Sequence, residues 1–304
     1  MSDAEAEPRL LLIDASIYLF RGYFSLPEAW HDSSGIPTNA LLGFARALMS
    51  GIKAHAPTHV SVAFDASLTT CFRNTLYPAY KANRPPPDQA IVKQMAHCQR
   101  LCELLGLHYC ADAQYEADDL IASMLTMWRD NNGGGAVWLM TRDKDYGQLL
   151  NDACTQIWDT AGEPALNRDG FIAKYRVAPE CFPDYQALVG DKIDNIPGVA
   201  GVGATTASHL LRRYDSLEKL YENLDEIRAG VTGVRRHARV AEDLRGARAH
   251  AFLMRDLTRL RRDIAPLCSP GLLRPSGSNA ADLHTFLAHT GLAKALPMHE
   301  LIHG

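Results

Sequence analysis

The sequence predicts an α/β fold with a mainly parallel central sheet flanked by helices, followed by a smaller helical unit. Up to about residue 185, short apolar stretches with the length of buried strands alternate with longer amphipathic stretches, as in a parallel sheet covered by helices. Beyond that point the strand-like stretches stop, and glycine turns and clustered arginines replace them. With 304 residues, the chain is long enough for one large domain and a smaller one.

Three apolar stretches are expected to form long strands of the sheet, and one more is expected to form a brief strand. They are residues 9–14 (RLLLID), 58–65 (THVSVAFD), 136–141 (AVWLMT) and, briefly, 107–110. Each of the three long stretches ends at an aspartate or is followed closely by one. Because parallel strands end at the same edge of a sheet, we expect these aspartates to lie close together.

The expected helices share an apolar stripe that repeats every three to four residues. They span residues 38–54, 88–105, 116–129 and 281–290. Asp88 follows three prolines and is expected to cap the second of these helices. Residues 131–135 are expected to form a loop, and residues 265–280, which are rich in Pro, Gly and Ser, a linker.

Composition excludes several classes of protein and leaves DNA binding open. No apolar run approaches the length of a membrane span, and the acidic first residues do not resemble a signal peptide. Seven scattered cysteines without a CxxC pair favour a reducing, cytoplasmic setting. The net charge of −4 argues against a nucleic-acid partner. Nine of the 35 acids, however, belong to one proposed site, and without them 31 bases outnumber 26 acids, which is compatible with DNA binding.

Those nine acids are expected to meet at one edge of the sheet. Three of them follow strands, three begin a helix that leaves the same edge (the EADD run), one extends a strand's loop, and two come from the start of the second unit. They are Asp14, Asp65, Asp143, Glu116, Asp118, Asp119, Asp145, Asp191 and Asp194.

Each acid taken singly has a simpler explanation. The EADD run could only complement a helix dipole, Asp143 could only cap a helix, and an aspartate after a strand is often a turn residue. The whole set has no such explanation, because so many carboxylates would repel one another unless cations neutralise them. Oxygen ligands suit Mg²⁺ or Mn²⁺, and two such ions about 4 Å apart can cleave a phosphodiester.

Six motifs follow one another along the chain. They are residues 10–24 (LLLIDASIYLFRGYF), 62–73 (VAFDASLTTCFR), 77–86 (YPAYKANRPP), 115–122 (YEADDLIA), 141–150 (TRDKDYGQLL) and 190–207 (GDKIDNIPGVAGVGATTA). In this order they resemble the 5′-nuclease family, which includes flap endonucleases and the N-terminal nuclease domain of bacterial DNA polymerase I. Residues 251–264 also resemble a later helical segment of that family.

The resemblance implies a PIN-like nuclease core over residues 1–187, with an arch segment at 66–90. It implies a DNA-binding domain with a helix–three-turn–helix element over 188–264, and a linker and C-terminal helix over 265–304. With no polymerase domain after residue 304, we expect a free-standing, monomeric enzyme of bacterial or phage type.

The resemblance also implies roles for individual residues. Asp14, Asp65, Glu116, Asp118 and Asp119 would hold a first metal ion, and Asp143, Asp145, Asp191 and Asp194 a second. In the arch segment, Lys81 and Arg84 would stabilise charge at the scissile phosphate, while Asp118 and Asp143 would serve the chemistry directly. The remaining expected DNA contacts are Arg21, Arg73, Tyr77, Tyr80, Gly198, Gly201 and Gly203.

Several of these roles have alternatives. Tyr77 and Tyr80 could stack on an unpaired base or belong to a solvated loop, and Arg21 and Arg73 could contact phosphate or neutralise the acids. The glycine element could bind backbone phosphate and a K⁺ ion, or could only pack. Thr205 stands where the family frequently has a lysine, so duplex affinity through this element is expected to be weaker.

The function that follows is a structure-specific 5′ nuclease that hydrolyses DNA at 5′ ends and 5′ flaps by a two-metal-ion mechanism, in replication or repair. One rival is a DNA-junction binder without catalysis, although an intact set of acids argues against it. A PIN-type ribonuclease is a second rival, because it would share the acidic sheet edge but not the glycine element. A small-molecule phosphatase would leave the arch and the arginine-rich helices without a purpose.

Overall fold

The computed structural model describes residues 7–66, 71–132, 135–264 and 269–297. The expected arch segment, the loop at 131–135 and the linker therefore lie partly outside the described residues. Among the helices of the described ranges, none combines the length and the apolar character needed to cross a membrane.

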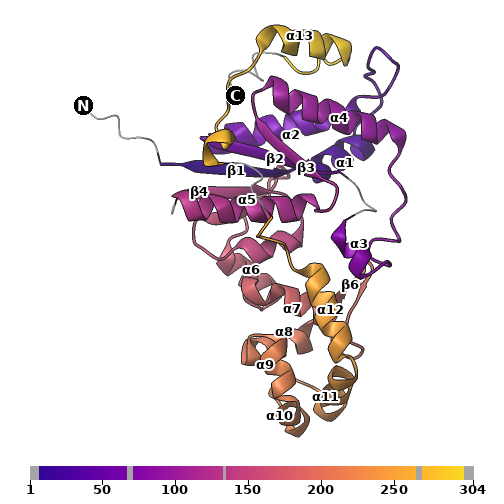
Figure 1. Ribbon diagram of the computed structural model, residues 1–304, viewed down its shortest axis with the longest axis vertical. Helices are drawn as coiled ribbons and strands as arrows, with labels where there is room; N and C mark the ends of the chain where they lie inside the picture. Colours follow the sequence, from indigo (N-terminus) through magenta and orange to yellow (C-terminus); the bar gives the residue numbers. More distant parts are fainter. Residues whose placement is uncertain (1–6, 67–70, 133–134, 265–268, 298–304) are drawn as a thin grey trace, which may run out of the picture.

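A five-stranded sheet forms the centre of the molecule (Figure 1). Its strands are parallel and run in the order β3-β2-β1-β4-β5. Their bounds are β1 (Arg9–Asp14), β2 (His59–Asp65), β3 (His108–Asp112), β4 (Ala136–Met140) and β5 (Thr155–Trp158). The predicted mainly parallel sheet is confirmed. Strand β5 was not predicted, because a four-residue edge strand carries too little periodicity to be identified.

Helices cover both faces of the sheet, so alternate residues of β1 face two apolar cores. Leu11 and Ile13 pack with residues of α1, α2, α4 and α13, whereas Leu10 and Leu12 pack on the side of α5. All four side chains are fully buried. The bounds of these helices are α1 (Ala15–Ser25), α2 (Asn39–His55), α4 (Gln89–Leu104), α5 (Ala117–Asn132) and α13 (Ala280–His289).

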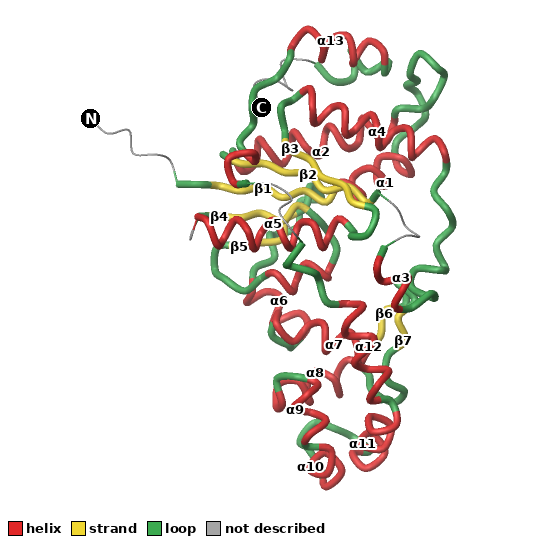
Figure 2. Tube along the Cα trace, viewed as in Figure 1, coloured by secondary structure: helices red, strands yellow, loops and turns green. Residues whose placement is uncertain are grey.

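A helical part continues from the α5 side of the sheet (Figure 2). Its core is continuous with that of the sheet, because residues from Leu10 in β1 to Leu257 in α12 form one apolar cluster. Its helices are α6 (Arg168–Tyr175), α7 (Phe182–Val189), α8 (Ala204–Tyr214), α9 (Leu217–Glu222), α10 (Leu224–Ala229), α11 (His237–Gly246) and α12 (Arg248–Thr258). A two-stranded hairpin, β6 (Gly190–Asp191) and β7 (Ile196–Pro197), joins α7 to α8.

Two segments differ from the sequence prediction. Helix α5 runs to Asn132 and so takes up the start of the expected loop. The described part of the expected linker packs on the core: Leu273 is fully buried in a short 3-10 helix, and Ser276 N–H donates to Gly106 O at 2.9 Å. Composition indicated a linker here because small and polar residues outnumber the single anchoring leucine.

Candidate metal centre and nucleic-acid site

Three of the acids gather where the strands of the sheet end. Asp14 closes β1 and Asp65 closes β2, and these strands run side by side in parallel register. Asp65 Oδ1 accepts a hydrogen bond from the N–H of Ala117 at 2.8 Å, which places the start of α5 against β2. Asp143 follows β4, and its side chain accepts from the Asp145 N–H at 2.9 Å.

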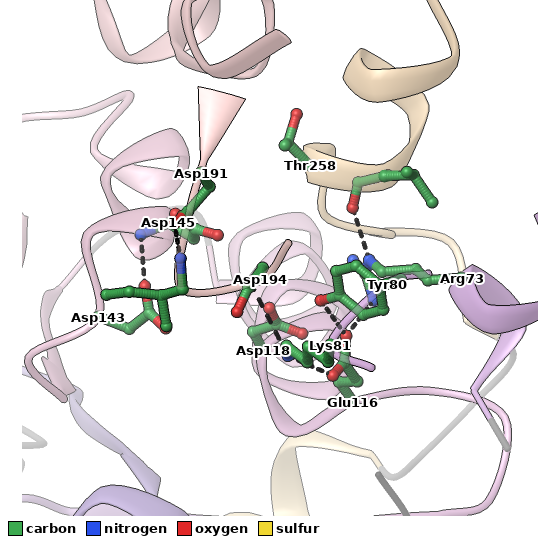
Figure 3. A network of polar contacts seen from close by, with 12 residues as sticks. Arg73, Tyr80, Lys81, Glu116, Asp118, Asp143, Asp145, Asp191, Asp194 and Thr258 are labelled. Carbon is green, nitrogen blue, oxygen red and sulfur yellow. Dashed lines mark hydrogen bonds and ion pairs between the residues drawn. The ribbon is translucent and has the colours of Figure 1, made fainter. Parts of the chain in front are cut away.

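The helical part supplies two further acids through the β6–β7 hairpin. Asp191 and Asp194 lie on this hairpin, and their carboxylate oxygens lie within 4.8 Å of an oxygen of Asp145. A second group with the same spacing is formed by Glu116, Asp118 and Asp119. Figure 3 shows the labelled acids of both groups pointing into one region. Closely spaced carboxylate oxygens are the donor set that hard divalent cations prefer.

Burial and mutual repulsion make these acids costly to ionise, which favours their binding protons or cations. Burial, reinforced by Asp65 and Asp143, raises the pKa of Asp14 to about 7. Burial and Asp143 likewise raise the pKa of Asp145 to about 7. The pKa of Asp118 is also raised, by burial first and by Asp119 second. Carboxyls with raised pKa values at one place lose their repulsion when a cation binds them.

Two lysines already contribute positive charge to this region. Lys81 Nζ lies 2.5 Å from Glu116 Oε1 and 4.0 Å from an oxygen of Asp194. Lys144 pairs with Asp191 and lies 3.6 Å from Asp145 Oδ1. Lys144 was not among the predicted site residues. Its position between two of the predicted ligands in the DKD run was the available signal.

Arg73 is a buried partner of the acids. Its side chain is 1% exposed, and it pairs with Glu116 at 2.9 Å and with Asp119 at 2.5 Å. This corrects the expectation that Arg73 contacts DNA and favours the alternative that it neutralises the cluster. Asp119 is fully buried, and its oxygens accept bonds from both Arg73 and the N–H of Arg261. Both carboxylate oxygens of Asp119 thus already accept hydrogen bonds from donors of the protein itself.

The arch segment is docked on the acids. Arg84 Nη2 lies 2.6 Å from Asp194 Oδ1, and Asn195 Nδ2 donates to the Ala79 carbonyl oxygen at 2.7 Å. Tyr80 is 3% exposed and donates its hydroxyl hydrogen to Glu116 Oε2 at 2.8 Å, so its ring is not available for stacking on a base. That expectation is corrected, because the ring packs in the apolar core. Tyr77 is half-buried against the same core.

Burial and ion pairing oppose each other at Glu116. Burial alone would raise the pKa of this carboxyl, but Lys81 and Arg73 outweigh it and hold the pKa below its usual range. Lys81 and Arg73 thus keep Glu116 ionised, whereas burial makes Asp14 and Asp145 hold their protons more tightly. Neighbouring groups with opposed pKa shifts are common at functional sites.

Arg21 has a partner outside the nine acids. Its guanidinium contacts both carboxylate oxygens of Asp159, at 3.0 and 3.1 Å, and donates to Thr160 Oγ1 at 3.0 Å. The Tyr18 hydroxyl also donates to Asp159. Arg21 therefore has a partner that could not be predicted, because Asp159 follows the unpredicted strand β5.

The glycine element turns tightly on the surface of the helical part. Gly198 lies against the end of α7, where an added Cβ would come within 2.5 Å of Val189 and Leu188 backbone atoms. Gly201 has a φ of +78°, which favours glycine. Gly203 precedes α8 with open space around it, and like Gly201 and Thr205 it is exposed. Close packing explains Gly198, and the exposed backbone leaves room for a ligand at the start of α8.

Five of the acids line a pocket of about 520 Å³ that also has an aromatic wall; they are Asp14, Asp65, Glu116, Asp118 and Asp143. Phe20 and Phe24 on α1 are 36% and 79% exposed, and their rings stack with centroids 6.4 Å apart. This pocket, called the acidic pocket below, also includes Lys81 and Arg84. The two phenylalanines were not among the predicted site residues, although their spacing of four residues in a predicted site motif would place them on one helix face.

Family models match nearly the whole chain. The model of the N-terminal resolvase-like domain of 5′-3′ exonucleases matches residues 9–176, and that of their C-terminal SAM fold matches residues 177–278. A 5′-3′ exonuclease of Aquifex aeolicus is 36% identical over 217 residues, covering 71% of this chain and 73% of the relative. A DNA polymerase I of Mycobacterium bovis is 35% identical over 90% of this chain, which spans only 29% of that relative's length.

Solved structures share the fold at lower identity. The T5 D15 protein co-crystallised with metal ions aligns with a TM-score of 0.67 and 19% identity, covering 82% of this chain and 89% of that one. The catalytic core of Rad2 in complex with DNA substrate aligns with a TM-score of 0.60 and 14% identity, covering 97% and 92%. These similarities confirm a PIN-like sheet domain followed by a helical domain.

Proposed function

The chain belongs to the 5′-3′ exonuclease family, and from this we propose that it hydrolyses DNA phosphodiesters at 5′ ends and 5′ flaps during replication or repair. The observation that carries the proposal is the acidic pocket. Residues from β1, β2, the start of α5 and the loop after β4 line it, and Asp14 there has a raised pKa. Such an arrangement supports metal-assisted phosphodiester hydrolysis.

The donor set fits two divalent ions, Mg²⁺ or Mn²⁺. Asp14, Asp65, Glu116 and Asp118 would hold one ion, and Asp143, Asp145, Asp191 and Asp194 the other. Asp119 is assigned to holding Arg73, because its oxygens already accept bonds from protein donors. When bound, the ions would supply Lewis-acid stabilisation of the phosphoryl oxygens and a more acidic water.

The side chains around the ions have their own tasks. Lys81 and Arg84 line the acidic pocket from the arch segment and would donate to the phosphate oxygens on which negative charge develops. Phe20 and Phe24 give the same pocket an apolar wall against which bases can stack and which excludes water. Ions would replace the ammonium groups of Lys81 and Lys144 at the acids and free both lysines for the substrate.

The proposed substrate is DNA with a single-stranded 5′ arm, bound by a monomer. Its duplex would lie on the glycine element, where the exposed backbone at Gly201, Gly203 and the start of α8 can approach phosphates. A K⁺ ion at this turn is part of the proposal. Support comes from relatives, because a T5 D15 flap endonuclease and the Rad2 catalytic core are described in complexes with DNA.

Cleavage of a duplex with a labelled 5′ flap tests the proposal. In the presence of Mg²⁺ or Mn²⁺, the wild-type protein is expected to release products with a 5′-phosphate, while Asp14→Ala and Asp191→Ala are inactive and still bind the DNA. Wild-type turnover by either variant would contradict the assigned roles. Binding without any cleavage by the wild type would favour a junction binder, and equal cleavage of an RNA flap would favour a ribonuclease.

A further inference from the structure

A second groove lies beside α3 (Phe72–Leu76), outside the acidic pocket. Its volume is about 600 Å³. One wall is α3, and the other is formed by the end of α12 and the extended residues that follow it. The groove is lined by Phe72, Thr75, Gln114, Asp256, Arg259 and Arg261, together with part of Leu76. None of these side chains lines the acidic pocket.

The groove has a net positive charge. Arg259 is exposed, and within the described part of the chain its guanidinium has no hydrogen bond or ion pair. Arg261 pairs with Asp263 at 2.9 Å, but both side chains are largely exposed, so this pair is weak and can exchange for a phosphate. The one acid in the lining, Asp256, lies 3.5 Å from Arg255 Nε.

An aromatic ring in the groove lies close to two guanidinium groups. The Arg261 guanidinium carbon lies 5.9 Å from the centre of the Phe72 ring, and that of Arg73 lies 4.7 Å from it. Tyr115 packs against Phe72 with ring centres 5.9 Å apart. A groove that combines guanidinium groups with an aromatic face is typical of proteins that bind single strands, whose phosphates and bases it can contact together.

The walls of the groove are held together by Arg73, the residue that also holds Glu116. Its Nε donates to Leu257 O at 2.7 Å and its Nη2 to Arg259 O at 3.4 Å, which joins α3 to the end of α12 (Figure 3). In the extended segment that follows α12, the Arg261 N–H donates to Asp119 Oδ1 at 2.8 Å. These bonds fix the two walls of the groove relative to each other, next to the acids.

We propose that this groove binds the unpaired 5′ arm of the DNA substrate, beyond the nucleotides in the acidic pocket. The proposal rests on the function proposed above. Arg259 and Arg261 contact phosphates of the arm, and Phe72, which lines the groove, contacts a base. Substrates with a long arm consequently bind more tightly than substrates with a very short one.

The test compares dissociation constants for two flap duplexes that differ only in the arm, which has either a single nucleotide or about 20. Fluorescence anisotropy in metal-free buffer measures binding without cleavage. For the wild type, we expect the long arm to bind more tightly. In the double variant Arg259→Ala/Arg261→Ala, we expect this advantage to fall by about tenfold, and the salt dependence of log Kd for the long arm to decrease by about 0.7 per lost phosphate contact.

Two further variants separate charge from packing. Phe72→Leu is expected to reduce the long-arm advantage without changing the salt dependence, and its unfolding midpoint reports whether the fold survives. The control is Arg100→Ala, because Arg100 is 51% exposed on α4 and pairs with Glu103. It lines neither the acidic pocket nor the groove beside α3. Both of its dissociation constants should match the wild type.

An unchanged long-arm advantage in the double variant would overturn the proposal. An equal loss of affinity for both arms would also overturn it, because the arginines would then bind the duplex. Failure of the proposed function is a separate result, seen as absent cleavage of the single-nucleotide flap when Mn²⁺ is added to the wild type.

Discussion

Protons and divalent ions are expected to compete for single acids of the candidate site. Asp14 and Asp145 have folded-state pKa values of about 7, well above the usual 3.8. Between about pH 4 and pH 7 the folded protein therefore holds more protons than the unfolded chain at these two groups. Their contribution to the stability of the metal-free protein declines as pH rises through this window and is constant above it.

The first prediction is a pH-dependent stabilisation by metal. Because a divalent ion binds the ionised carboxylates, saturating Mn²⁺ should raise the unfolding temperature little at about pH 5.5 and much more at about pH 7.5. Thermal unfolding with and without Mn²⁺ measures this difference. The double variant Asp14→Asn/Asp145→Asn serves as the control and should lose most of it. An equal Mn²⁺ effect on the wild type at both pH values would contradict the prediction.

Single residues also mark the limit of what the sequence could predict. The types and spacing of the nine acids indicated a common edge, since strand direction alone brings most of them there. The partners of Arg73 and Tyr80 could not be predicted in the same way. Their burial depends on how α12 and the arch segment pack, and in a sequence a buried arginine looks the same as one that contacts phosphate.

At the level of elements, Arg73 connects three segments that are distant in the chain. From α3 it pairs with Glu116 and Asp119 at the start of α5 and donates to the carbonyl oxygen of Leu257 in α12. A buried arginine in a complete network is costly to remove, because the two carboxylates would remain buried without their partner.

The second prediction follows from this network. Arg73→Met should lower the free energy of unfolding by roughly 3–5 kcal/mol. Urea denaturation measures the change. The matched control is Arg142→Met, which removes a half-exposed arginine near Asp159 and Glu163 and should cost at most about 1 kcal/mol. Similar losses for the two variants would show that the Arg73 network contributes no more than a surface pair.

Elements differed in how well the sequence predicted them. Strands β1, β2 and β4 and helices α2, α4 and α5 were predicted because each carries a clear apolar period. Strand β5 and the 3-10 helix around Leu273 are too short for such a period, and tertiary contacts define them. Missing β5 also hid Asp159, and with it the partner of Arg21.

For the whole molecule, the arrangement of the two parts completes the candidate site. The sheet supplies Asp14, Asp65 and Asp143, while the β6–β7 hairpin of the helical part supplies Asp191 and Asp194. One apolar cluster runs through both parts, so the hairpin is held against the sheet edge. The central claim is that this convergence exists to bind divalent ions.

Diffraction from crystals soaked in Mn²⁺ at about pH 7.5, measured at the manganese absorption edge, tests this claim most directly. We predict anomalous peaks among the carboxylates, with Lys81 and Lys144 moved away from Glu116 and Asp191 as the ions replace their charge. No peak at this edge of the sheet under saturating Mn²⁺, with both lysines still paired to the acids, would contradict the account.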